Sequence, residues 1–333
     1  MLPQACAAMM REMAHWANPS SPHAEGRAAR ARLEEARARI AAALGWGGEI
    51  LFTSGASEAI AIALGRAKAE RIMTSPVEHD AVLRVTPGRP RLAVNAQGVL
   101  VLQGHEQQGE GRLLLAIQHV NNETGVIQPL ETLVPEGAIL FADCAQSAGK
   151  LALPQADLIA VSAHKFGGPP GVGALLVRDL ALLEATGGQE RGYRAGTENA
   201  PAILAMAAAL EAPRDWLDHA AELRGWLDAA IVQEGGEVVA AGAARIPTIA
   251  SYRMPGVSAR AQLIRFDMAG IAVSAGSACS SGTLKASHVL TAMGWDEAVA
   301  GEVVRVSFGP STARADLERF LAAWRDIAKG AAR

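Results

Sequence analysis

Hydrophobic residues follow two different spacings along the chain, and these predict alternating helices and strands. Residues 24–44 carry apolar positions at helical spacing, and the glycines at 45, 47 and 48 end this predicted helix. Short apolar runs predict strands at residues 49–53, 71–74, 113–118, 138–142, 158–161 and 173–177, and an apolar helix is expected near residues 201–210. This alternation predicts an α/β fold with a mostly parallel sheet flanked by helices.

The pattern changes after Pro213, where a second and smaller unit is expected. Further helical residues are followed by short predicted strands at 249–253, 271–274 and 303–308, then by an amphipathic helix at 315–329. Strands of this kind favour a smaller α+β domain. We therefore predict an N-terminal arm at residues 1–11, a large domain at 12–211 and a small C-terminal domain at 212–333.

Composition narrows the class of partner. The 333 residues suffice for two domains, the net charge is −3, and no apolar run reaches the roughly 18–20 residues that span a bilayer. No basic stripe indicates nucleic acid, and the N-terminus does not resemble a secretion signal. Three cysteines argue against a disulfide framework and for a reducing cytoplasm. We expect a small-molecule partner, no nucleic acid, no membrane and no metal.

Lys165 is the first candidate for chemistry. Only five of the 31 basic side chains are lysines, and Lys165 follows the apolar run 158–161 within the segment SAHKFGG. Arginine stays protonated, whereas a lysine with a lowered pKa is a nucleophile. A structural lysine would more often lie on a solvated helix face. The setting therefore favours an amine that reacts with an aldehyde cofactor.

Two further segments suit such a cofactor. Asp143 ends the apolar run 138–142, where ligands bind in open α/β sheets, and it could pair with a protonated ring nitrogen of pyridoxal, with Gln146 nearby. Taken alone, Asp143 is equally well explained as a turn aspartate. The segment 53–58 (TSGASE) joins a strand to a helix, so its backbone and Ser57 could bind a phosphate. An ordinary helix cap with a capping glutamate is the alternative.

Three isolated residues complete the candidate set. His79 could stack on a planar cofactor or move protons, although a structural role has somewhat better odds. Cys279 lies among small polar residues and is either a nucleophile or an inconsequential surface thiol. Arg305 interrupts an apolar strand, where it needs either a substrate carboxylate or an internal Asp or Glu.

Taken together, these segments resemble the class V aminotransferase-like enzymes, and within them the cysteine desulfurases of the NifS/IscS group. The resemblance runs in order over nearly the whole chain. It includes residues 18–23 (NPSSPH), 53–58 (TSGASE), 78–79 (EH), 121–125 (NNETG), 143–146 (DCAQ), 162–168 (SAHKFGG), 187–190 (GGQE), 194–199 (RAGTEN), 277–282 (SACSSG), 287–290 (SHVL) and 305–307 (RVS).

The resemblance implies pyridoxal 5′-phosphate (PLP) fold type I, with the large domain binding the cofactor and the small domain carrying a catalytic cysteine loop. Lys165 would hold PLP as a Schiff base and act on the substrate Cα proton, and Cys279 would take the sulfur of L-cysteine as a persulfide. The resemblance also implies that His79, Asp143 and Gln146 contact the ring. The phosphate would be bound by Ala56, Ser57, Ser162 and His164, joined by Thr197 from a second subunit. Arg305 and Asn122 would bind the substrate carboxylate. A homodimer and a sulfur-acceptor protein, such as an iron–sulfur scaffold, would be its partners.

The start of the chain departs from the family pattern. Family members usually open with a strand resembling Tyr-Leu-Asp-x-Asn-Ala-Thr-Thr, and the residues from Met1 to Pro3 resemble those that follow it. One alternative hypothesis is therefore an impaired homologue. Within the same fold, a selenocysteine lyase or other class V lyase or transaminase is another. The span between Asn122 and Asp143 leaves room for at most a brief helix.

Overall fold

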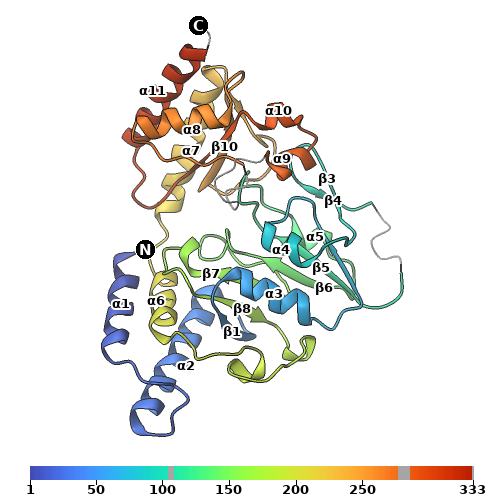
Figure 1. Cartoon of the computed structure of the whole chain (residues 1–333), viewed down its shortest axis with the longest axis vertical. Coiled ribbons are helices and arrows are strands. Elements are labelled where there is room, and N and C mark those ends of the chain that lie inside the picture. The colour runs from blue at the N-terminus through green and yellow to red at the C-terminus, as the bar shows by residue number, and fades with distance from the viewer. Residues whose placement is uncertain (104–108, 277–285, 332–333) are drawn as a thin grey trace.

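A six-stranded sheet lies at the centre of the N-terminal two thirds of the chain (Figure 1). The fold is given by a computed structural model, which describes residues 1–103, 109–276 and 286–331. The strand order is β1-β8-β7-β6-β5-β2, and β8 runs antiparallel to both of its neighbours, whereas the pairs from β7 to β2 are parallel. The strands are β1 (Glu49–Thr53), β2 (Arg71–Thr74), β5 (Leu113–Gln118), β6 (Ile139–Asp143), β7 (Leu158–Ser162) and β8 (Gly173–Val177).

Helices cover both faces of this sheet. Alternate strand residues point to opposite faces, so Phe52 joins the core beneath α2 and α6, whereas Leu51 joins the core beneath α3. The helices are α2 (Ala24–Leu44), α3 (Ala56–Arg66), α4 (Asp80–Val85), α5 (Leu130–Leu133) and α6 (Ala200–Leu210), with a short ribbon of β3 (Ala93–Val94) and β4 (Leu100–Val101) at the side. The predicted mostly parallel α/β sheet is confirmed, and α5 is the brief helix expected.

The first residues form a helix of their own. Helix α1 (Pro3–Ala14) packs against α6 through small side chains, with Ala5 against Ala205 and Ala209. Before it, the Leu2 amide donates to the Gly167 carbonyl over 2.7 Å. The first residues of the chain thus contact the segment that follows Lys165.

A second sheet and its helices form the C-terminal part, drawn at the top of Figure 1. The antiparallel order is β11-β10-β9, and the core contains Phe266 stacked on Phe320 and the fully buried Trp324. Its elements are α7 (Trp216–Gln233), β9 (Glu237–Val238), β10 (Ile249–Arg253), α8 (Ala259–Met268), α9 (His288–Ala292), α10 (Glu297–Ala300), β11 (Val303–Ser307) and α11 (Arg314–Ala331). In the part of the chain described, no helix is both long and apolar enough to cross a membrane.

The strand predicted at residues 271–274 is wrong. Residues 269–271 instead close the end of α8, where the Ile271 amide bonds to the Phe266 carbonyl and Gly270 takes the left-handed conformation at φ 70°. Only one isolated antiparallel bridge, Ser274 to Arg305, remains of the expected pairing in the described residues. The other predicted elements agree with the structure to within about three residues at their ends.

Candidate active site

Most predicted site residues border one cavity at the carboxyl ends of the parallel strands. The cavity has a volume of about 430 Å³, within the range of sites that enclose a small cofactor. It is lined by ten of the twelve predicted residues: Ala56, Ser57, His79, Asn122, Asp143, Gln146, Ser162, His164, Lys165 and Arg305. Thr197 is exposed and does not border it, and Cys279 lies outside the described residues.

Lys165 lies at the end of a short 3₁₀ turn, Ala163–Lys165, that directly follows β7. The Ser162 hydroxyl and His164 Nδ1 are 3.0 Å apart and hydrogen-bonded, which ties the two sides of this turn together. Burial and the charge of Lys165 both lower the pKa of His164, so its imidazole is neutral at pH 7. The turn therefore presents one amine and two hydrogen-bonding side chains to the cavity.

Asp143 ends β6 and faces the same cavity from a fully buried strand end. Its Oδ1 accepts a hydrogen bond of 2.9 Å from the Ala145 amide. Burial raises the pKa of Asp143, opposed by this hydrogen bond and by the electrostatic effect of the nearby His79 and Lys165. A buried carboxylate of this kind gains most from a cationic partner, which a protonated ring nitrogen supplies.

The imidazole of His79 has a defined tautomer. His79 caps α4, and its Nδ1 accepts a hydrogen bond of 3.1 Å from the Ala81 amide, so the proton lies on Nε2. The preceding backbone is held on two sides: the Gln118 amide group donates to the Val77 carbonyl at 2.6 Å, and His288 Nε2 lies 2.9 Å from the Glu78 carbonyl. These contacts fix the position of the ring at the cavity wall.

The segment between β1 and α3 provides a site for an anion. Gly55 has φ +151° and is the N-cap residue of α3. A Cβ on Gly173 would come within 2.7 Å of the Gly55 Cα, so only glycine fits at position 173. Glu58 accepts a hydrogen bond from the Ser54 amide, so the capping glutamate considered as the alternative is also present. The turn thus combines a cap with backbone amides and the Ser57 side chain at the cavity.

Arg305 links the C-terminal sheet to the large sheet. It lies on β11 opposite Ser251, and its Nη1 donates to the Asn122 carbonyl over 2.8 Å. A carbonyl of the facing loop is thus one of the groups that Arg305 contacts. A second cavity, of about 710 Å³, begins beside it and is lined by both Arg305 and Lys165.

Some cavity residues were missed in the sequence. Gln118 ends β5 beside Asp143, and the rule that placed Asp143 at a strand end applies to it equally. His288 belongs to the quoted segment 287–290, but nothing in its spacing indicated that it would reach Glu78. Gln118 could thus have been predicted from its place at a strand end. His288 could not, because its contact depends on where α9 packs in the fold.

The residues present fit PLP. The cofactor needs an amine, a carboxylate for its ring nitrogen and donors for its phosphate, and the cavity brings Lys165, Asp143 and the turn at Gly55 to its wall. The close packing of Gly55 against Gly173 leaves the backbone of that turn accessible without an intervening Cβ. The donor set is therefore that of a phosphorylated pyridoxal rather than of a metal or a dinucleotide.

Comparison with known proteins agrees with this geometry. Residues 1–320 match the model of the family Aminotransferase class-V. The protein named Cysteine desulfurase IscS 1 of Archaeoglobus fulgidus is 34% identical over 337 residues, covering 92% of this chain and 88% of that protein.

Solved structures give the same result. One described as a NifS-like protein has a TM-score of 0.89 at 28% identity and covers 99% of this chain and 96% of its own. Another, described as SspA in complex with cysteine, has a TM-score of 0.77 at 29% identity, with 94% and 97% covered. Members of this family depend on PLP, which confirms the predicted cofactor and fold type. The chain belongs to the class V aminotransferase family, to which its IscS- and NifS-like relatives also belong.

Proposed function

We propose that this protein is a cysteine desulfurase that moves the sulfur of L-cysteine to Cys279, releasing L-alanine. The observation that carries the proposal is the meeting of Lys165, Asp143 and Arg305 at one cavity, in a chain with relatives named cysteine desulfurase. PLP, when bound, supplies a pyridinium ring that stabilises negative charge developing at the substrate Cα.

The cavity residues suit this reaction by charge and position. Arg305 would bind the substrate carboxylate together with Asn122, and the Lys165 amine would move the Cα proton. Asp143 and Gln146 would bind the ring, with His79 against its face. Ala56, Ser57, Ser162 and His164 would bind the phosphate.

The sulfur step needs a thiolate, and Cys279 is the best candidate in the chain. The bond from the substrate Cβ to sulfur breaks and leaves its electron pair on the carbon skeleton, while the sulfur bonds to Cys279 Sγ as a persulfide. The carbon skeleton then takes up a proton at Cβ and regains the Cα proton, which completes alanine. Cys144 is a poor nucleophile because it is buried and burial raises the pKa of its thiol. Cys6 borders neither of the two cavities described above. The described residues on both sides of 277–285 border cavities that Arg305 also lines.

We further propose that the protein acts as a homodimer in the cytoplasm. Thr197 is exposed and away from its own cavity, which suits contact with the phosphate of a second copy. The Cys279 thiol must stay reduced to take up the sulfur, which favours a reducing compartment such as the cytoplasm. An acceptor protein, such as an iron–sulfur scaffold, would then receive the sulfur.

The test is the production of sulfide and alanine from cysteine by the purified protein, with and without PLP. Lys165→Ala should abolish the bound chromophore, and Cys279→Ser should keep the chromophore but release no sulfide. A protein that binds no PLP would refute the proposal. Selenide release that survives Cys279→Ser would instead indicate a selenocysteine lyase, and inactivity with PLP bound would indicate an impaired homologue.

A further inference from the structure

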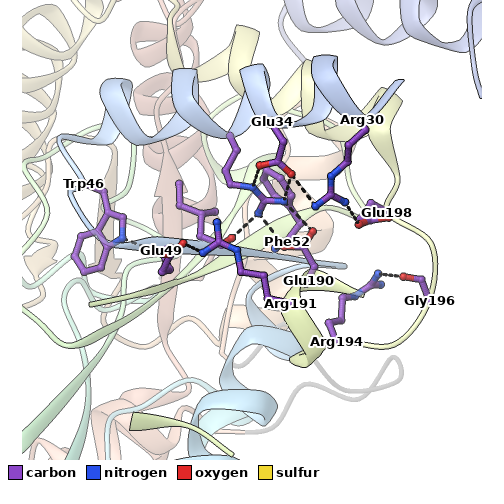
Figure 2. A network of polar contacts seen from close by, with 12 residues as sticks. Arg30, Glu34, Trp46, Glu49, Phe52, Glu190, Arg191, Arg194, Gly196 and Glu198 are labelled. Carbon is purple, nitrogen blue, oxygen red and sulfur yellow. Dashed lines mark hydrogen bonds and ion pairs between the residues drawn. The ribbon is translucent and has the colours of Figure 1, made fainter. Parts of the chain in front are cut away.

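The loop between β8 and α6 is tied to the rest of the fold by arginine–glutamate ion pairs (Figure 2). Arg37 of α2 binds both carboxylate oxygens of Glu190, at 2.9 and 3.1 Å, and Arg30 of the same helix binds Glu198 at 3.2 Å. The side chains of Glu190 and Glu198 are 1% and 0% exposed, respectively. The loop is therefore anchored to α2 at two buried carboxylates, one in its second half and one just before α6.

The anchored loop has a backbone that ordinary residues rarely adopt. Glu190 and Arg191 have φ values of 48° and 56°, in the left-handed region. One Glu190 oxygen also accepts the Phe52 amide of β1 at 2.8 Å, so the bend is fixed to the central sheet as well as to the helix. Such a conformation persists only where the surrounding contacts determine it.

After this bend, Arg194 connects the loop to Glu58, which borders the cavity. Arg194 Nε donates to Glu58 Oε1 over 3.1 Å, joining residues 136 positions apart, and the other oxygen of Glu58 accepts the Ser54 amide. Although burial by itself raises the pKa of Glu58, the hydrogen bonds from Ser54 and Arg194 and the charge of Arg194 lower it overall. Glu58 is thus ionised at pH 7.

The position of Glu58 creates an electrostatic problem for the proposed cofactor. Glu58, Ser54 and Ser57 all border the cavity, and the turn they form is the proposed phosphate site. A carboxylate there would repel a phosphate dianion. Arg194 does not border the cavity, but its guanidinium neutralises the charge of Glu58. Glu58 in turn holds the Ser54 amide in place.

We infer that Arg194 is a positioning residue for phosphate binding, which acts by neutralising Glu58 and is held in register by the Arg37–Glu190 pair. This inference rests on the proposed function, because it assumes that PLP occupies the cavity. It assigns a role to an arginine that touches neither cofactor nor substrate within its own chain. It also gives a role to the strained bend at Glu190 and Arg191, which precedes Arg194 in the same loop.

The experiment compares the affinity of apoprotein variants for PLP and for pyridoxal, which lacks the phosphate. Arg194→Gln should weaken PLP binding roughly tenfold, because an uncompensated charge then faces the phosphate, and should leave pyridoxal binding unchanged. The double variant Arg194→Gln/Glu58→Gln should recover the PLP affinity of the wild type to within about twofold, because the repelling charge is gone. The matched control is Arg191→Gln, which changes another arginine of the same loop and removes its ion pair with Glu49 of β1. It should change neither affinity.

Each outcome separates the inference from the proposed function. If the wild type binds no PLP, the proposed function fails. If the wild type binds PLP but Arg194→Gln weakens PLP and pyridoxal equally, or the double variant recovers nothing, the inference fails alone. Should Arg194→Gln not fold, Glu58→Gln decides: the inference requires its PLP affinity to be at least that of the wild type.

Discussion

A buried carboxyl beside the cavity should make stability depend on pH, and a glutamine should remove that dependence. Glu78 is 0% exposed, and its Oε1 accepts a hydrogen bond from the Ser75 hydroxyl. Burial raises the pKa of Glu78 from 4.5 to about 8, opposed by hydrogen bonds from Ser75 and Gln118 and assisted by the charge of Asp143. The folded protein therefore holds a neutral Glu78 at pH 7.

The magnitude follows from the two pKa values. The unfolded chain loses this proton near pH 4.5, whereas the folded chain keeps it to about pH 8. The contribution of Glu78 to stability is thus fully present below pH 4.5 and is lost as the pH rises towards 8. At about 1.4 kcal/mol per pH unit, the loss between pH 5 and pH 8 is roughly 4 kcal/mol.

Glu78→Gln keeps a neutral side chain of the same shape that can still accept from Ser75. Urea unfolding of the apoprotein at pH 5 to 8.5, followed by circular dichroism, gives the free energy of unfolding for both proteins. The difference, variant minus wild type, should grow by roughly 4 kcal/mol over this range. Glu184→Gln, an exposed control, should run parallel to the wild type. Parallel curves for Glu78→Gln would show that Glu78 is ionised in the fold and refute the reasoning.

Variants at three more positions test packing and charge elsewhere. Glu190→Ala should lower the free energy of unfolding by about 2–4 kcal/mol, because Arg37 loses a buried partner. Glu190→Gly should lower it by about 1 kcal/mol less, because glycine adopts the positive φ without strain. Equal losses in urea unfolding would show that the backbone at Glu190 is not strained. Phe266→Ala should cost about 3–5 kcal/mol, since its ring is fully buried and stacked on Phe320, and calorimetry showing less than about 1 kcal/mol would be inconsistent. Burial lowers the pKa of Lys150 to about 8, so Lys150→Met should add most stability below pH 8 and progressively less towards pH 10; a gain independent of pH would oppose this.

Local patterns were enough for most of the elements. The helix predicted at residues 24–44 has those bounds, because Gly45 takes a left-handed conformation that ends it. The prediction for segment 271–274 failed because its apolar alternation matches a strand, whereas the amide of Ile271 closes α8 and only Ser274 pairs with β11. A hydrophobic period describes which side chains are buried and not where the hydrogen bonds of a segment go.

The candidate site likewise contains residues that the sequence predicts and contacts that it does not. Lys165, Asp143 and Ser57 were recognisable because each lies at the end of a strand or within four residues after it, and the carboxyl ends of parallel strands share one edge. The tautomer of His79 and the approach of His288 to Glu78 were not predictable, since each depends on a contact with an amide or carbonyl in space.

The amino-acid sequence by itself thus determined the alternation of elements, the family and the candidate amine, because these depend on local spacing and residue chemistry. The tertiary structure alone decided which charges meet. Arg194 and Glu58 are 136 positions apart, and Arg37 and Glu190 are 153 positions apart. No local pattern pairs such residues, because their charges interact only after the packing of the sheet and its helices has brought the segments together.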